Sequence, residues 1–240
     1  MWESTRAWVL THRAYGDKGM ILHCLTDRFG RQSYYLPSIR SRNSPIRPSM
    51  VLPLTPLALV ARHRGKEQLE RIKEARLLWH PKSLHQHPIK AAVCLYLAEF
   101  IDRIFTEVQE QITLWDFVEE HLIQYDESTQ ENLHFPLWFS VHLLSFSGLA
   151  LPQQRKLGSF FDWHEAVWKV QESESSLNLQ TSALLADLLQ HSWPEAASLK
   201  SQGEQRRQLM DGLARFLEWH VPGHRTLKSV EVLRVYLGGV

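Results

Sequence analysis

Residues 4–36 read STRAWVLTHRAYGDKGMILHCLTDRFGRQSYYL, and this stretch decides the N-terminal fold. Residues 4–15, 19–26 and 32–36 are rich in β-branched and aromatic side chains, and apolar positions alternate along them, as is typical of short strands. The segments between them, Gly16-Asp17-Lys18-Gly19 and Asp27-Arg28-Phe29-Gly30, have turn composition, with glycine available for a positive φ. The stretch therefore predicts a three-stranded meander.

Further strands follow a polar loop. Residues 37–53 are dominated by Ser, Arg, Asn and Pro, which indicates a long exposed loop. Residues 57–64 and 68–78 then predict two more strands around a turn at Gly65. Five short strands within about 80 residues favour a small closed barrel, because an open sheet would leave its edges exposed.

After Pro81 the apolar residues recur at helical spacing. The pattern predicts helices over 88–105, 112–125, 131–146, 181–190, 204–219 and 228–237, with a short hairpin near 159–168. We therefore expect an α+β protein with two domains, a barrel over 1–80 and a helical domain over 81–240.

The charge of the chain is divided unevenly between these two segments. Residues 1–80 hold 14 Lys and Arg against six Asp and Glu, a net charge of +8, whereas the remaining residues hold 13 against 20, a net charge of −7. Between Arg28 and Lys66 there is no acidic residue at all. Such an asymmetry indicates that the basic segment meets a polyanion.

A basic barrel with aromatic side chains suits single-stranded nucleic acid, because cations pair with phosphates while flat rings stack on unpaired bases. Phe29, Tyr34 and Tyr35 are the aromatic candidates, although one of the two adjacent tyrosines must point into the barrel. The predicted nucleic-acid-binding residues are Arg28, Arg31, Tyr34, Arg40, Arg42, Arg47, Arg62, Arg64 and Lys66.

The sequence contains no pattern typical of an enzyme or of a metal site. There is no phosphate-binding glycine loop, nucleophile elbow or paired-carboxylate motif, and the acids beside His164, Asp162 and Glu165, are more typical of a strand end or turn. The only cysteines, Cys24 and Cys94, form no CxxC pair. We predict no catalytic residue, metal or cofactor, and metal analysis would detect the alternative of a metal-dependent hydrolase.

Neither a signal peptide nor a membrane-spanning stretch is apparent, so we expect a cytoplasmic protein without membrane contact. Two further classes of function fit the same composition. One is an RNA-binding barrel, which competition between DNA and RNA would distinguish. The other is a structural adaptor whose basic face meets acidic protein surfaces.

Short segments along the whole chain resemble the RecO family of recombination mediators. The resemblance rests on the opening strand with Tyr15, on Asp17 where the family commonly has Glu, and on the segments 7–15, 21–26, 29–31, 38–47, 69–75, 160–162 and 227–233. Many family members also carry a four-cysteine zinc motif in the helical domain. This chain has no cysteine between Leu144 and Phe160, so we expect the zinc motif to be absent.

The resemblance implies an N-terminal OB-fold and an all-α helical domain. It also implies binding of single- and double-stranded DNA, annealing of complementary strands, and cooperation with RecR in loading RecA onto DNA coated by single-stranded-DNA-binding protein (SSB). An acidic, apolar-ended SSB tail needs a cation at the rim of a hydrophobic groove. Arg103, Arg155 and Lys156 are the candidate partner-binding residues for it.

Overall fold

The computed structural model describes residues 1–42, 44–63, 69–105, 112–129, 132–156, 158–223 and 226–237. They form two compact units, Met1–Ser128 and Thr129–Val240. The predicted division at residue 80 follows the change from strands to helices. The compact units divide at residue 128, because the first two helices belong with the barrel.

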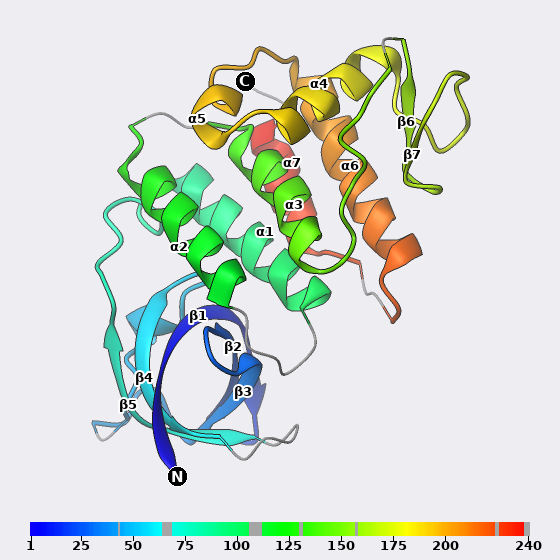
Figure 1. The fold of residues 1–240 in the computed structure, drawn as a ribbon. Coiled ribbons are helices and arrows are strands. Elements are labelled where there is room, and N and C mark those ends of the chain that lie inside the picture. The colour runs from blue at the N-terminus through cyan, green and yellow to red at the C-terminus, as the bar shows by residue number, and fades with distance from the viewer. Residues whose placement is uncertain are drawn as a thin grey trace. The chain divides into compact units, whose positions relative to one another are not determined.

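The first unit begins with a closed five-stranded barrel, which confirms the predicted fold class (Figure 1). Its strands are β1 (Trp2–Tyr15), β2 (Gly19–Thr26), β3 (Gly30–Leu36), β4 (Pro56–Arg62) and β5 (Glu70–Leu77), arranged in the order β1-β2-β3-β5-β4. The long β1 pairs with β4 through its first half and with β2 through its second, which closes the barrel. The predicted turn glycines Gly16 and Gly30 have positive φ, at 65° and 58°.

Alternate residues of the strands fill the barrel interior, as the two-residue period of a strand requires. The buried cluster contains Ala7, Val9, Leu22, Cys24, Tyr34, Leu36, Leu57, Leu59, Ala61 and Ile72. The loop between β3 and β4 adds Ile46 and, from its short 3₁₀ helix (Pro48–Val51), Met50 and Val51. This loop is therefore anchored by its own apolar residues.

Two helices of the first unit cover part of the outer face of the barrel. They are α1 (Pro88–Ile104) and α2 (Ile112–Glu127), and α1 packs against β1 and β2. Trp8 of β1 stacks on Trp115 of α2, with ring centroids 5.2 Å apart, and contacts the edge of Trp79. Ile21 and Leu25 of β2 are also fully buried, although their neighbours in β2 fill the barrel interior. The part of the outer face of β1 and β2 around Trp8, Ile21 and Leu25 is thus not open to solvent.

A buried polar network holds the segment before α1, residues 82–84, against the C-terminal end of α2. The carboxylate of Asp126 accepts hydrogen bonds from the backbone N–H groups of Lys82, Ser83 and Leu84, at 2.7–2.9 Å. Lys90 of α1, which is 3% exposed, donates to the carbonyl oxygens of Tyr125 and Ser128, both at 2.7 Å. The backbone groups at these helix ends therefore have partners, which their burial requires.

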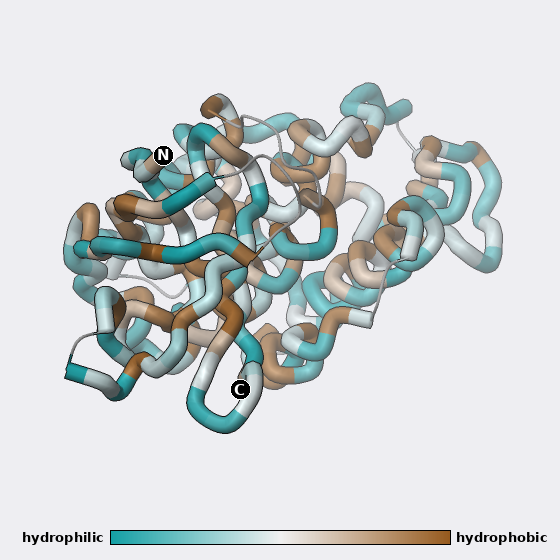
Figure 2. Tube along the Cα trace, turned by 90° about the horizontal axis from the view of Figure 1, so that it is seen from below, coloured by the Kyte–Doolittle hydropathy of each residue, from teal (hydrophilic) through white to brown (hydrophobic). Residues whose placement is uncertain are grey.

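The second unit is helical, as predicted, with one small hairpin. It contains α3 (Phe135–Phe146), β6 (Phe160–Asp162), β7 (Val167–Lys169), α4 (Leu179–Gln190), α5 (Trp193–Ala196), α6 (Gly203–His220) and α7 (Ser229–Leu237). Hydrophilic and hydrophobic residues alternate along most of the chain trace (Figure 2). Among the described helices, none combines the length and the apolar character that a membrane crossing would need.

Candidate nucleic-acid interface

The loop between β3 and β4 presents three predicted arginines to solvent. Arg40, Arg42 and Arg47 are all exposed, while Ile46 between them is fully buried in the barrel core. The loop backbone is held locally, because Ser44 donates its hydroxyl to the carbonyl oxygen of Ile46 at 2.8 Å. Exposed guanidinium groups on an anchored loop can approach phosphates without first breaking other contacts.

Within the described residues, no Asp or Glu forms an ion pair with any of these three arginines. Their charge is therefore not neutralised by the described part of the protein. A cation without a protein partner gains most from a phosphate, because no existing ion pair has to be given up and bound counterions are released.

Other predicted cations of the barrel already have partners. Arg31 donates to Asp102 of α1 at 2.8 Å, and both side chains are largely buried. Arg28 lies 3.7 Å from the carboxylate of Glu3 and donates to the carbonyl oxygen of Ser4. Arg28 and Arg31 therefore differ from the loop arginines in having acidic partners, although the sequence predicted the same role for all of them.

Of the remaining basic candidates, the structure describes only Arg62, at the end of β4. Arg62 is exposed, and its guanidinium lies over the ring of Trp2 at 5.8 Å from the ring centroid. Arg64 and Lys66 lie outside the described residues. Arg62 therefore forms, with Trp2, an exposed pair of a cation and an aromatic ring.

Tyr34 is the tyrosine that points into the barrel, so its ring is not accessible to a base and the structure does not support its predicted place among the binding residues. Its side chain is fully buried in the barrel core, and its hydroxyl lies 2.8 Å from Nε2 of His63. Burial raises the pKa of this phenol. Tyr35, the next residue, is only partly buried and contacts the ring of Tyr15 edge to face at 5.7 Å. Of the two tyrosines, Tyr35 is the one placed to contact a ligand.

Phe29 is also engaged within the protein. Its ring stacks on the imidazole of His63, with centroids 3.7 Å apart, and the guanidinium of Arg28 lies 5.2 Å from its centroid. Burial lowers the pKa of His63 to about 4, so the imidazole is neutral at pH 7. The Phe29 ring therefore already has contacts that a stacking base would have to replace.

Sequence reasoning missed two exposed cations on β5. Arg71 and Arg76 have no ion pair within the described residues. Both are exposed, because their neighbours Ile72 and Ala75 pack into the barrel on either side of a β-bulge. Both lie beyond the acid-free stretch of the sequence, which ends at Lys66 because Glu67, Glu70 and Glu74 follow. Strand alternation from Ile72 would have identified Arg71 but not Arg76, because a β-bulge between Ile72 and Ala75 shifts the alternation.

The candidate partner-binding cations differ in their surroundings. Arg103 in the first unit forms an ion pair with Glu99 one helical turn earlier, at 3.5 Å. In the second unit, Arg155 donates to the carbonyl oxygen of Ser159, and its guanidinium lies 5.7 Å from the ring centroid of Trp168. Lys156 is exposed. None of these contacts identifies a partner, so the assignment remains a proposal.

The acids beside His164 have a structural role. Asp162 ends β6, and its carboxylate accepts hydrogen bonds from the backbone of His164 and Glu165 and from Nζ of Lys169. These donors lower its pKa. The prediction of a strand end with a capped turn is confirmed.

The described residues contain no group of three His, Cys, Asp or Glu side chains arranged to hold a metal ion. Cys24 and Cys94 are fully buried, and burial raises the pKa of both thiols. Two separate buried thiols do not fit a four-cysteine zinc site, and the predicted absence of zinc remains to be measured.

Comparison with known proteins covers nearly the whole chain. Residues 1–79 match the family described as Recombination protein O N terminal, and residues 85–230 match Recombination protein O C terminal. The chain is 28% identical over 238 residues to the DNA repair protein RecO of Phocaeicola vulgatus, which covers 98% of both chains. It is 26% identical over 235 residues to that of Azobacteroides pseudotrichonymphae, which covers 95% of this chain and 96% of the relative.

Proposed function

The chain belongs to the RecO family, and on this premise we propose that it is a DNA-binding recombination mediator that works without catalysis of its own. It binds single- and double-stranded DNA, anneals complementary strands, and with RecR helps to load RecA onto SSB-coated single-stranded DNA in the cytoplasm. The observation that carries this proposal is the set of three exposed loop arginines, Arg40, Arg42 and Arg47, without an acidic partner in the described part of the chain.

Annealing of two strands is opposed by the repulsion between their phosphates. A protein that neutralises phosphates on one strand lowers this repulsion and lets a second strand approach, with no need of a nucleophile, a cofactor or ATP. Sequence-independent contacts of this kind are also what a mediator requires, because repair occurs at any sequence. The loop arginines supply such contacts.

The proposal extends to protein partners through the family resemblance of the sequence. An SSB tail that is acidic and ends in apolar residues would need a cation beside apolar surface. Lys156 is exposed, and Arg155 lies against Trp168, so these two residues are the better candidates. Arg103 is the weaker candidate, because it is already paired with Glu99.

Annealing of SSB-coated complementary oligonucleotides tests the proposal. We expect the wild-type protein to accelerate annealing, and the triple variant R40E/R42E/R47E to lose most of this acceleration. The matched control is K200E/R207E/R215E, which changes the net charge equally at exposed positions of the second unit. If the wild-type protein does not accelerate annealing, the mediator function is wrong. If both variants lose it equally, net charge and not the loop is responsible.

A further inference from the structure

A groove follows β4 along the outer face of the barrel, and the strand register explains why it forms. Across β1, β4 and β5, Arg6 pairs with Ala58, and Ala58 pairs with Arg76. These side chains point outward, because Leu57 and Leu59 fill the interior. A small residue between two long ones leaves a channel whose floor is β4.

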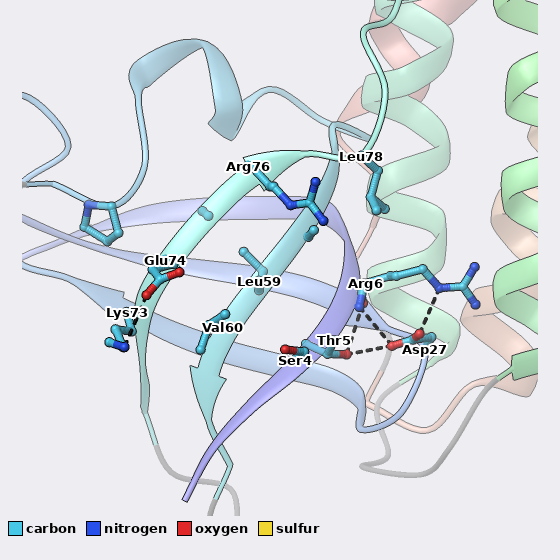
Figure 3. Close-up of a pocket in the computed structure, with 13 residues that line it drawn as sticks. Ser4, Thr5, Arg6, Asp27, Leu59, Val60, Lys73, Glu74, Arg76 and Leu78 are labelled. Atoms are coloured by element: carbon cyan, nitrogen blue, oxygen red, sulfur yellow. Dashed lines mark hydrogen bonds and ion pairs between the residues drawn. The ribbon is translucent and has the colours of Figure 1, made fainter.

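The next row of the register continues this channel. Ser4 of β1 pairs with Val60 of β4, and Val60 pairs with Glu74 of β5. The resulting groove has a volume of about 630 Å³ and also reaches Pro45 in the loop between β3 and β4 (Figure 3). It is therefore continuous with the loop that carries Arg40, Arg42 and Arg47.

The two walls of the groove differ in their free charge. On the β1 side, Arg6 is held by Asp27 at 2.9 Å and by Glu119 at 3.2 Å, so its charge is balanced within the protein. On the β5 side, Lys73 pairs with Glu74 at 3.2 Å. Arg76 has no ion pair within the described residues and is exposed. Arg76 is thus the wall cation available to an anionic ligand.

An aromatic side chain stands beyond one end of the groove. Trp2 pairs with Arg62 in the row after Ser4 and Val60. The residue is 44% exposed, and the Arg62 guanidinium lies over its ring. An apolar floor, a free wall cation and an exposed indole along one strand correspond to what an unpaired nucleotide needs, since the phosphate is neutralised while the base stacks.

In many OB-folds, oligonucleotides lie across the second and third strands. Here the outer face of β2 is buried, with Ile21 and Leu25 inaccessible, and Arg31 on β3 is tied to Asp102 of α1. We infer that single-stranded DNA follows the groove along β4 instead, with a phosphate on Arg76, sugars and bases over Ala58 and Val60, and a base on Trp2. This inference rests on the proposed function and assigns the path of the single-stranded DNA.

Two substitutions test the path by binding of a fluorescent oligothymidylate and of a duplex. Ala58→Trp fills the groove without changing charge, and we expect it to lower single-strand affinity by about tenfold, the effect of losing one packed nucleotide. Arg76→Ala should lower the single-strand salt slope by about 0.7, the contribution of one phosphate contact. Duplex binding should change little in Ala58→Trp, because a double helix is too wide to enter the groove.

The controls are Ala14→Trp and Arg13→Ala, which make the same changes at exposed positions of the β1–β2 hairpin, away from the groove. Thermal unfolding of each variant separates loss of folding from loss of binding. If the loop variant R40E/R42E/R47E loses binding while Ala58→Trp and Arg76→Ala bind as wild type, the groove assignment is wrong and the proposed function stands. If the wild-type protein binds no DNA, the proposed function itself fails. If Ala58→Trp loses only the binding of a glutamate-rich peptide, the groove belongs to an acidic protein segment and the inference is overturned.

Discussion

Replacement of the three loop arginines by alanine should reduce the salt dependence of single-stranded DNA binding by a defined amount. Each phosphate contact contributes about 0.7 to the slope of log affinity against log salt concentration for a single strand, so three contacts contribute about 2. With a slope contribution of that size, lowering the salt concentration from 1 M to 0.1 M raises the affinity by about 100-fold. We therefore expect R40A/R42A/R47A to bind about 100-fold more weakly at 0.1 M salt, and to differ little from wild type near 1 M.

The measurement is a fluorescence anisotropy titration of an oligothymidylate at several salt concentrations. The matched control is Arg31→Ala, because the Arg31 guanidinium is paired with Asp102 and both side chains are largely buried. Removing it leaves a shielded carboxylate without its partner, which should cost about 1–3 kcal/mol of folding stability while the salt slope stays near that of wild type. An unchanged slope in the triple variant would refute the reasoning. So would a slope in Arg31→Ala that is as flat as that of the triple variant.

Two further predictions concern stability. Asp126→Ala removes a buried carboxylate that accepts hydrogen bonds from three backbone N–H groups, and it should lower the free energy of unfolding by about 2–4 kcal/mol, measured by urea denaturation. The control is Asp187→Ala, at a carboxylate that accepts no such bonds in the described structure. His134 is 7% exposed, and burial lowers its pKa to about 4, so the unfolded chain binds a proton more readily between pH 6.5 and 4. The free energy of unfolding should therefore decrease by up to about 3 kcal/mol as the pH falls from 6.5 to 4, which urea denaturation at several pH values measures. His134→Gln should remove that part of the pH dependence.

The barrel could be predicted from the sequence because its signals are local. Each strand carries its own alternation, and the turns contain glycines at the positions that adopt positive φ, such as Gly16 and Gly30. The loop between β3 and β4 was also predictable, since its Ser, Arg and Pro composition excludes a strand. What the composition did not show is that Ile46 anchors this loop in the barrel core.

The candidate site was harder to predict, because exposure and pairing are set by tertiary contacts. Asp102 lies 71 residues after Arg31 in the chain, so no local pattern reveals their ion pair. For the two adjacent tyrosines, alternation requires that they point to opposite sides but does not say which is inside. The register decides this, since Tyr34 lies opposite Leu22, an interior residue of β2.

The covering helices and the position of the binding surface have a common physical cause. Trp8, Ile21 and Leu25 make the outer face of β1 and β2 strongly apolar, and such a face is stable only when it is covered. The helices that cover it bring Asp102 to Arg31, and this contact uses a cation that would otherwise be free. Among the described residues of the barrel, exposed cations without an acidic partner then lie on the loop before β4, on β5 and on the β1–β2 hairpin. Burial of the one face therefore leaves the loop arginines and Arg76, which lie beside β4, as a basic surface open to a nucleic acid.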